Sequence, residues 1–81
     1  MAEPTIDKEL DLSNEVCPYT FMKTKLALQG MESGQHLQVR LGNSESASNV
    51  PRSIELEGHE VVSLDQPGDS EWLVVVKRSA G

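Results

Sequence analysis

The sequence predicts an α/β (α+β) two-layer sandwich with the element order β-α-β-α-β-β, in which two helices cover one face of a four-stranded mixed sheet. Residues 35–41 alternate apolar and polar side chains, which is typical of a half-buried strand. Residues 18–31 and 47–57 carry apolar side chains three or four positions apart, which is typical of amphipathic helices. Each helix must bury its apolar stripe against the sheet, and a β-α-β start favours parallel strands joined by a right-handed crossover.

The first expected elements are a strand over about Glu9–Ser13 and a helix from Pro18 to about Met31. Leu10-Asp11-Leu12 alternates like a short strand. Pro18 suits the first helical position because it lacks an N–H and its φ is fixed near the helical value. The sequence Glu32-Ser33-Gly34 is expected to end the helix. The expected core-facing stripe lies at i, i+3, i+7 and i+10, with Ala27 beside it, and comprises Phe21, Thr24, Leu28 and Met31.

A strand over Gln35–Leu41 should place Leu37, Val39 and Leu41 on its buried side. Several N-cap candidates then occur over Ser44–Ser48, and a second helix follows to about Glu57, where Gly58 ends it. Its apolar face is formed by Ala47, Val50 and Ile54. Pro51 would damage a helix interior, so we expect the regular helix to begin near Ser48 or Asn49.

The C-terminal part is expected to form a hairpin of His59–Leu64 and Glu71–Lys77, with Pro67-Gly68 as its turn. The chain is too short for two domains, so residues 1–81 are expected to form a single domain. Residues 1–7 are expected to be a loose tail and residues 78–81 to be frayed.

Composition excludes several classes of function. The chain has 81 residues with 37% hydrophobic and 25% charged side chains, which is ordinary for a globular protein. Its net charge of −6 argues against nucleic acid and anionic membranes as partners. No apolar run is long enough to span a membrane, and residues 1–8 lack the apolar region of a signal peptide. One cysteine and two isolated histidines offer no ligand spacing for a metal, and a lone thiol fits the reducing cytoplasm.

The lone cysteine, Cys17, stands at the expected junction of strand and helix, directly before Pro18. A sulfur at this position would face free backbone N–H groups and the positive end of the helix dipole. Both favour the thiolate, which is the nucleophilic form. The sequence therefore predicts a reactive Cys17, although a free cysteine is also commonly a buried apolar residue.

A cysteine protease with His36 or His59 as the base is disfavoured. Acyl transfer also needs a group that orients the base, an oxyanion hole and a substrate cleft, and a small two-layer domain has little room for these. Each histidine has a plain structural role available, at the start of a strand and in the turn after Gly58.

The chain resembles the TusA-like (SirA-like) sulfur-carrier proteins. The resemblance runs from about Leu10 to Lys77, and its matching stretches are Leu10-Asp11-Leu12, Val16-Cys17-Pro18, Phe21-Met22, the helix end at Met31–Gly34, Val50-Pro51 and Gly58-His59-Glu60-Val61. The signature of that family is Cys-Pro-x-Pro. Cys17 and Pro18 match it, Tyr19 takes the free position, and Thr20 replaces the second proline, which restores an N–H to the backbone.

This resemblance implies a sulfurtransferase-like carrier whose catalytic residue is Cys17, with Pro18, Tyr19 and Thr20 as the supporting motif. Cys17 would accept a persulfide sulfur from a donor protein, either a cysteine desulfurase or a rhodanese-like protein, and pass it to an acceptor protein. No dissociable cofactor and no metal is implied, and we expect a cytoplasmic monomer.

Tyr19, Met22 and Leu26 share a second face of the first helix, next to Lys23 and Lys25. Such a face is either ordinary surface or a docking patch for a partner protein, for which we single out Met22, Lys23, Lys25 and Leu26. The alternative to a sulfur carrier is a non-catalytic interaction or regulatory domain with a structural Cys17, because one fold hosts several functions.

Overall fold

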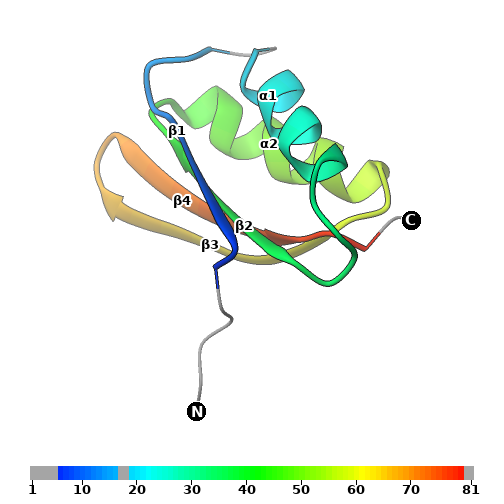
Figure 1. Ribbon diagram of the computed structural model, residues 1–81. Helices are drawn as coiled ribbons and strands as arrows, with labels where there is room; N and C mark the ends of the chain where they lie inside the picture. Colours follow the sequence, from blue (N-terminus) through cyan, green and yellow to red (C-terminus); the bar gives the residue numbers. More distant parts are fainter. Residues whose placement is uncertain (1–5, 17–18, 80–81) are drawn as a thin grey trace.

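A four-stranded sheet and a pair of helices on one of its faces form the two layers of the molecule (Figure 1). The computed structural model describes residues 6–16 and 19–79. The predicted order β-α-β-α-β-β and the two-layer fold are confirmed. The elements are β1 (Lys8–Leu12), α1 (Tyr19–Gln29), β2 (His36–Leu41), α2 (Ser44–Leu56), β3 (Glu60–Gly68) and β4 (Glu71–Lys77).

The sheet is mixed, with the strand order β1-β2-β4-β3. β1 and β2 run parallel, with Leu12 opposite Leu41, because α1 carries the chain back to the start of β2. β4 pairs antiparallel with both β2 and β3. The C-terminal ends of β1 and β2 therefore lie side by side, and each leads into the segment that begins a helix.

The core lies between the helices and the sheet, as the periodicities predict. Leu37, Val39 and Leu41 of β2 are fully buried, and the buried face of α2 comprises Ala47, Val50 and Ile54 together with Ser46. α1 buries Thr24 and Leu28 as expected, and also Thr20 and Ala27. Phe21 is only half-buried and packs at the margin of the core. Over the described residues, neither helix is long and apolar enough to cross a membrane.

Both helices depart from their predicted boundaries. α2 begins at Ser44 because the Asn43 side chain accepts a hydrogen bond from the Ser46 N–H at 2.8 Å and caps the first turn. Pro51 therefore stands inside the helix, and its expected place in the first turn is wrong. α1 ends at Gln29, before Met31, because the chain tightens there, with the Gly30 N–H donating to the Ala27 carbonyl.

The hairpin turn is also displaced from its predicted position. β3 continues through Pro67 and Gly68, and Gly68 pairs with Glu71 so that only Asp69 and Ser70 connect the strands. A two-residue link is the commonest hairpin connection. Pro67 is tolerated because β3 is an edge strand with a register irregularity between Asp65 and Gly68.

Asp7 and Arg78, which were expected in a loose tail and a frayed end, are both hydrogen-bonded to the segment around the start of β2. Asp7 donates its N–H to the His36 carbonyl at 2.9 Å, and its side chain accepts the His36 N–H at 2.9 Å. Arg78 exchanges backbone bonds with Gly34 and Gln35. Strand pairing at the start of β2 thus extends to residues that the sequence had assigned to a tail and a frayed end.

Candidate functional site

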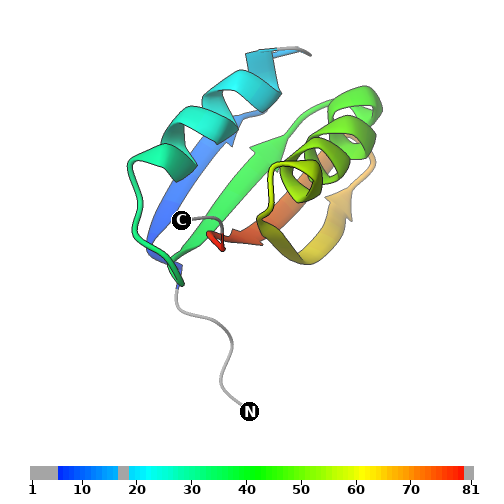
Figure 2. The same ribbon diagram turned by 90° about the vertical axis from the view of Figure 1, so that its right-hand side faces the viewer.

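Two helix starts share one end of the molecule. β1 ends at Leu12 and β2 at Leu41, which are paired, and α1 and α2 begin after these strand ends (Figure 2). The positive ends of both helix dipoles therefore lie at this end of the sheet. Cys17 and Pro18 fall outside the described residues, and so do the predictions made for them. The residues that flank them, Val16 and Tyr19, are described and define the site from both sides.

Two backbone hydrogen bonds join the residue before Cys17 to the first residues of α1. The Val16 carbonyl accepts the Tyr19 N–H at 2.8 Å and the Thr20 N–H at 3.3 Å. The expectation of free N–H groups is therefore wrong for these two residues, which already have an acceptor. The helix dipole is left as the favourable influence on an anion at this end.

The loop that leads into Cys17 is tied down over residues 13–15. Both the Ser13 hydroxyl and its N–H donate to Asp11, at 2.6 and 3.1 Å, and these bonds hold the pKa of Asp11 below its ordinary value. The Glu15 N–H donates to the Leu12 carbonyl at 3.0 Å. The backbone of Ser13 also passes so close to Gly42 that an added Cβ there would overlap the Ser13 carbonyl oxygen.

The start of α2 contacts both sides of the Cys17 segment. Before it, the Asn43 amide nitrogen donates to the Glu15 carbonyl at 3.1 Å. After it, the hydroxyls of Thr20 and Ser46 lie 3.0 Å apart, with both side chains fully buried. Sequence reasoning identified Thr20 but missed Asn43 and Ser46. The preference of asparagine for helix N-caps was the available signal for Asn43, whereas nothing local marks Ser46 as a partner of Thr20.

Lys23 and Lys25 are each paired with a carboxylate. The Lys23 ammonium lies 2.8 Å from Glu15, in the loop before Cys17, and the Lys25 ammonium lies 3.3 Å from Glu57. Lys25 also lies over the Phe21 ring, 6.0 Å from its centroid. All four charged side chains are at least one-third exposed, so these pairs contribute little to stability. Through this pair, the Lys23 side chain reaches the loop that precedes Cys17.

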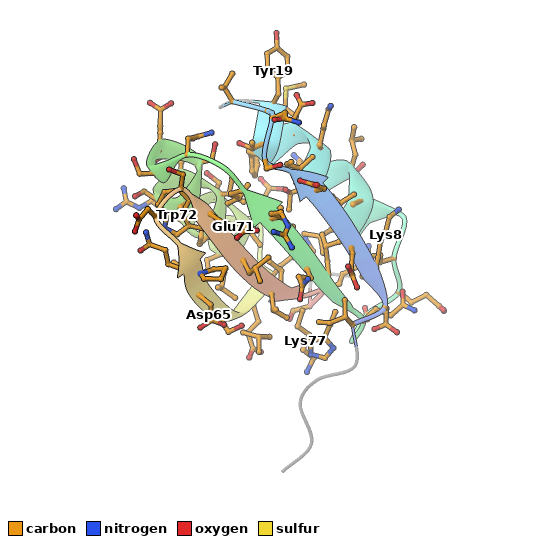
Figure 3. All side chains as sticks on the ribbon, turned by 90° about the vertical axis from the view of Figure 1, so that its left-hand side faces the viewer. Lys8, Tyr19, Asp65, Glu71, Trp72 and Lys77 are labelled. Atoms are coloured by element: carbon orange, nitrogen blue, oxygen red, sulfur yellow. The ribbon has the colours of Figure 1, made fainter. Side chains whose placement is uncertain are left out.

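An apolar stripe on α1 is exposed next to the motif. Tyr19, Met22 and Leu26 are 55%, 51% and 64% exposed, and Val16, just before Cys17, is 57% exposed. Tyr19 projects away from the body of the molecule at the end where α1 begins (Figure 3). Tyr19, Met22 and Leu26 are three or four residues apart, so these exposed side chains lie along one face of α1.

The histidines lie at the opposite end of the sheet from this site. His36 begins β2, a rise of about 16 Å from Leu41 at the strand's other end. The Nδ1 atom of His59 accepts the Ser79 N–H at 3.2 Å, and burial, followed by the Arg78 charge, lowers the pKa of His59. A Cys–His pair therefore has no support in this arrangement.

Two hollows of the surface also lie away from the start of α1. These shallow hollows, of about 320 and 350 Å³, occupy the open face of the sheet. Gln38 and neighbouring strand residues line both, and Ile6 lines the first. Neither is lined by a residue of α1 or α2. Among the described residues, no group of three or more acidic, histidine or cysteine side chains gathers as metal ligands would.

Comparison with known proteins gives a consistent result. Residues 8–78 match the family described as Sulfurtransferase TusA. A proposed sulfur carrier protein of Archaeoglobus fulgidus is 46% identical over 69 residues, covering 85% of this chain and 78% of that protein. One from Thermotoga maritima is 38% identical over 77 residues, covering 95% and 98%. The proposed sulfur carrier protein TsuB of Escherichia coli is 31% identical over 72 residues, covering 89% and 96%.

Solved structures share the fold. A crystal structure of a SirA-like protein from Desulfitobacterium hafniense superimposes with a TM-score of 0.77 at 22% identity, covering 90% of this chain and 99% of that one. The solution structure of a Helicobacter pylori protein gives a TM-score of 0.73 at 20% identity, with coverage of 89% and 97%. These two likenesses concern the arrangement of helices and strands.

Proposed function

The chain belongs to the TusA family, and on this premise we propose that it is a sulfur carrier whose single cysteine, Cys17, accepts, holds and releases one sulfane sulfur. One observation carries the proposal: the described residues on both sides of Cys17 are exposed, with Val16 at 57% and Tyr19 at 55%. The two hollows described above lie on the open face of the sheet, away from both helices. A group that exchanges sulfur with another protein needs exposed surroundings, whereas an enzyme for a small substrate needs a cleft.

The chemistry is an exchange that needs no oxidant and no reductant. The Cys17 thiolate attacks the terminal sulfur of a persulfide on the donor protein. A sulfur–sulfur bond forms on Cys17 while the sulfur–sulfur bond of the donor breaks, and the donor cysteine leaves as a thiolate. The proton of the transferred S–H remains with it or passes to solvent. In the second half, a nucleophile of the acceptor attacks the same terminal sulfur, and Cys17 returns to a thiolate.

The supporting motif would keep Cys17 at the start of α1. Pro18 would set the helix start, because its φ is already helical. Tyr19 and Thr20 anchor the following turn through the bonds of their N–H groups to Val16. The side chain of Thr20 adds a buried bond to Ser46, which a proline at this position would lack.

The sulfur donor would dock on the face of α1 formed by Met22, Lys23, Lys25 and Leu26, the α1 docking surface. Met22 and Leu26 are more than half exposed, and so is Tyr19 of the motif, one turn before Met22 on the same helix. α1 carries two lysines and no acidic residue, in a chain of net charge −6. Because Glu15 and Glu57 pair with these lysines, the helix surface is close to neutral, and it would repel an acidic partner less than the rest of the molecule does. The donor would be a protein that forms a persulfide, such as a cysteine desulfurase.

Mass spectrometry of the intact protein tests the proposal. The chain is incubated with a cysteine desulfurase and L-cysteine, and excess reagents are removed before the mass is measured. We expect the gain of one sulfur atom, removed again by a thiol reductant, and no gain in Cys17→Ser. A wild-type chain that never gains sulfur while the desulfurase is active would overturn the proposal, and so would an equal gain in Cys17→Ser.

A further inference from the structure

Asn43 makes two different hydrogen bonds with the two ends of its side-chain amide. The oxygen accepts the Ser46 N–H at 2.8 Å and caps α2, whereas the nitrogen donates to the Glu15 carbonyl at 3.1 Å. The first bond is local, three residues along the chain. The second joins segments 28 residues apart and fastens the loop before Cys17 to the start of α2. Aspartate or serine would cap the helix equally well, so capping alone does not require the amide nitrogen.

Apart from the ion pair of Glu15 with Lys23, the other hydrogen bonds described for this loop are local, because they join residues two or three positions apart. Glu15 is fixed by its own N–H bond to Leu12 and by the exposed ion pair with Lys23. The ion pair is exposed, and such pairs hold geometry weakly. On the other side of Cys17, the buried bond between Thr20 and Ser46 fastens α1 to α2. The side chain of Asn43 is partly buried, and among the described residues its bond to Glu15 joins the start of α2 to the loop before Cys17.

We propose that Asn43 is a positioning residue for Cys17: its amide nitrogen holds the Glu15 carbonyl and thereby fixes the position of the backbone just before Cys17. This rests on the proposed function only in that Cys17 is the reacting residue. Without the bond, the loop can move relative to the positive ends of the two helices. The thiolate then loses part of its stabilisation, so the pKa of Cys17 rises, and the sulfur is presented to the donor in a wider range of positions.

Asn43→Ser separates the two bonds. Serine keeps an oxygen that caps α2 but lacks a donor long enough to reach Glu15. The matched control is Asn49→Ser, on an exposed position of the same helix. Asn43→Asp is a second variant that retains the cap and replaces the donor by an acceptor facing the Glu15 carbonyl. The three variants and the wild type are compared at a temperature where circular dichroism shows each of them to be folded.

Two rates are measured for each protein: alkylation of Cys17 by iodoacetamide as a function of pH, and sulfur uptake from a cysteine desulfurase and L-cysteine. We expect Asn43→Ser to take up sulfur about tenfold more slowly than the wild type, and its alkylation profile to shift to higher pH. Asn43→Asp should show at least as large a change, and Asn49→Ser none.

An unchanged alkylation profile in both Asn43 variants would overturn the positioning role, even if their stability fell. An equal effect in Asn49→Ser would do the same. The alkylation measurement does not depend on a sulfur donor. If the wild type takes up no sulfur but Asn43→Ser still shifts the alkylation profile, the proposed function fails and the positioning role of Asn43 stands.

Discussion

The hydroxyl groups of Thr20 and Ser46 lie 3.0 Å apart, and neither side chain is exposed to solvent. This bond joins α1 to α2 near the N-terminal ends of both helices, beside the segment that carries Cys17. Thr24 continues the polar contact inward, because its hydroxyl donates to the Thr20 carbonyl at 2.7 Å. All three buried hydroxyls therefore have a partner, as buried polar groups require.

Replacing Thr20 by valine should destabilise the protein. The shape is kept but the Ser46 hydroxyl loses its buried partner, so we expect the free energy of unfolding to fall by about 1–3 kcal/mol. Ser46→Ala should cost a similar amount, and the double variant should cost clearly less than the sum, because no hydroxyl is then left unpaired. Urea denaturation measures all three, with the exposed Ser48→Ala as the control. Strictly additive losses would contradict the pairing.

Gly42 should tolerate no side chain. A Cβ at this position would overlap the Ser13 carbonyl oxygen, and both partners are backbone, so the loop before Cys17 must shift. We expect Gly42→Ala to lower the free energy of unfolding by about 1–3 kcal/mol. Gly30→Ala is the matched control, because its Cβ would meet the Ala27 carbonyl oxygen at an ordinary 3.7 Å. Equal thermal stability of the two variants would show that Ser13 and Gly42 are not in contact.

The α1 docking surface should matter to a protein donor and not to a small reagent. Substituting both Met22 and Leu26 by serine removes exposed apolar area beside Cys17, so sulfur uptake from a desulfurase should slow by about tenfold. Alkylation by iodoacetamide should stay unchanged, because the reagent needs no docking surface. Leu56→Ser, which alters an 82% exposed leucine on α2, should leave both rates unchanged. Sulfur uptake that is equally fast in the double variant and the wild type would show that the donor does not dock on this face.

His59 should make stability depend on pH between neutral and mildly acidic conditions. Burial, followed by the charge of Arg78, lowers its pKa in the folded state below the ordinary value of 6.5. The unfolded chain therefore binds the proton more readily, and stability is fully present above pH 6.5 and declines as the pH falls toward the folded-state pKa. The melting temperature of wild type should drop between pH 7.5 and pH 5.5 more than that of His59→Gln. Equal drops would show that His59 does not contribute.

Local sequence patterns were sufficient for the order of the elements and for most of their buried faces. The alternation in β2 and the spacing in α2 identified the residues that are now fully buried, among them Leu37, Val50 and Ile54. Two of the four prolines misled the prediction of element boundaries, because Pro51 is accommodated inside α2 and Pro67 inside an edge strand. In both cases the surrounding structure overrides a local preference.

The long-range contacts that shape the site could not be predicted from local sequence patterns. Asn43 bonds to Glu15, 28 residues away, and Thr20 bonds to Ser46, 26 residues away. Such pairs depend on how the two helices pack, which no short-range spacing encodes. The sequence did identify the exposed face of α1, since the helical period alone separates Met22 and Leu26 from the buried Thr24 and Leu28.

The most direct test of the central claim follows the sulfur through a complete cycle on Cys17. The chain is loaded by a cysteine desulfurase with L-cysteine that carries a heavy sulfur isotope, separated from the donor, and then treated with cyanide, which attacks the terminal sulfur of a persulfide. A sulfur carrier gains one heavy sulfur atom, returns to its original mass and releases one labelled thiocyanate per loaded chain. Label that never appears on the wild type, or that remains on the protein after cyanide, would contradict a carrier role for Cys17.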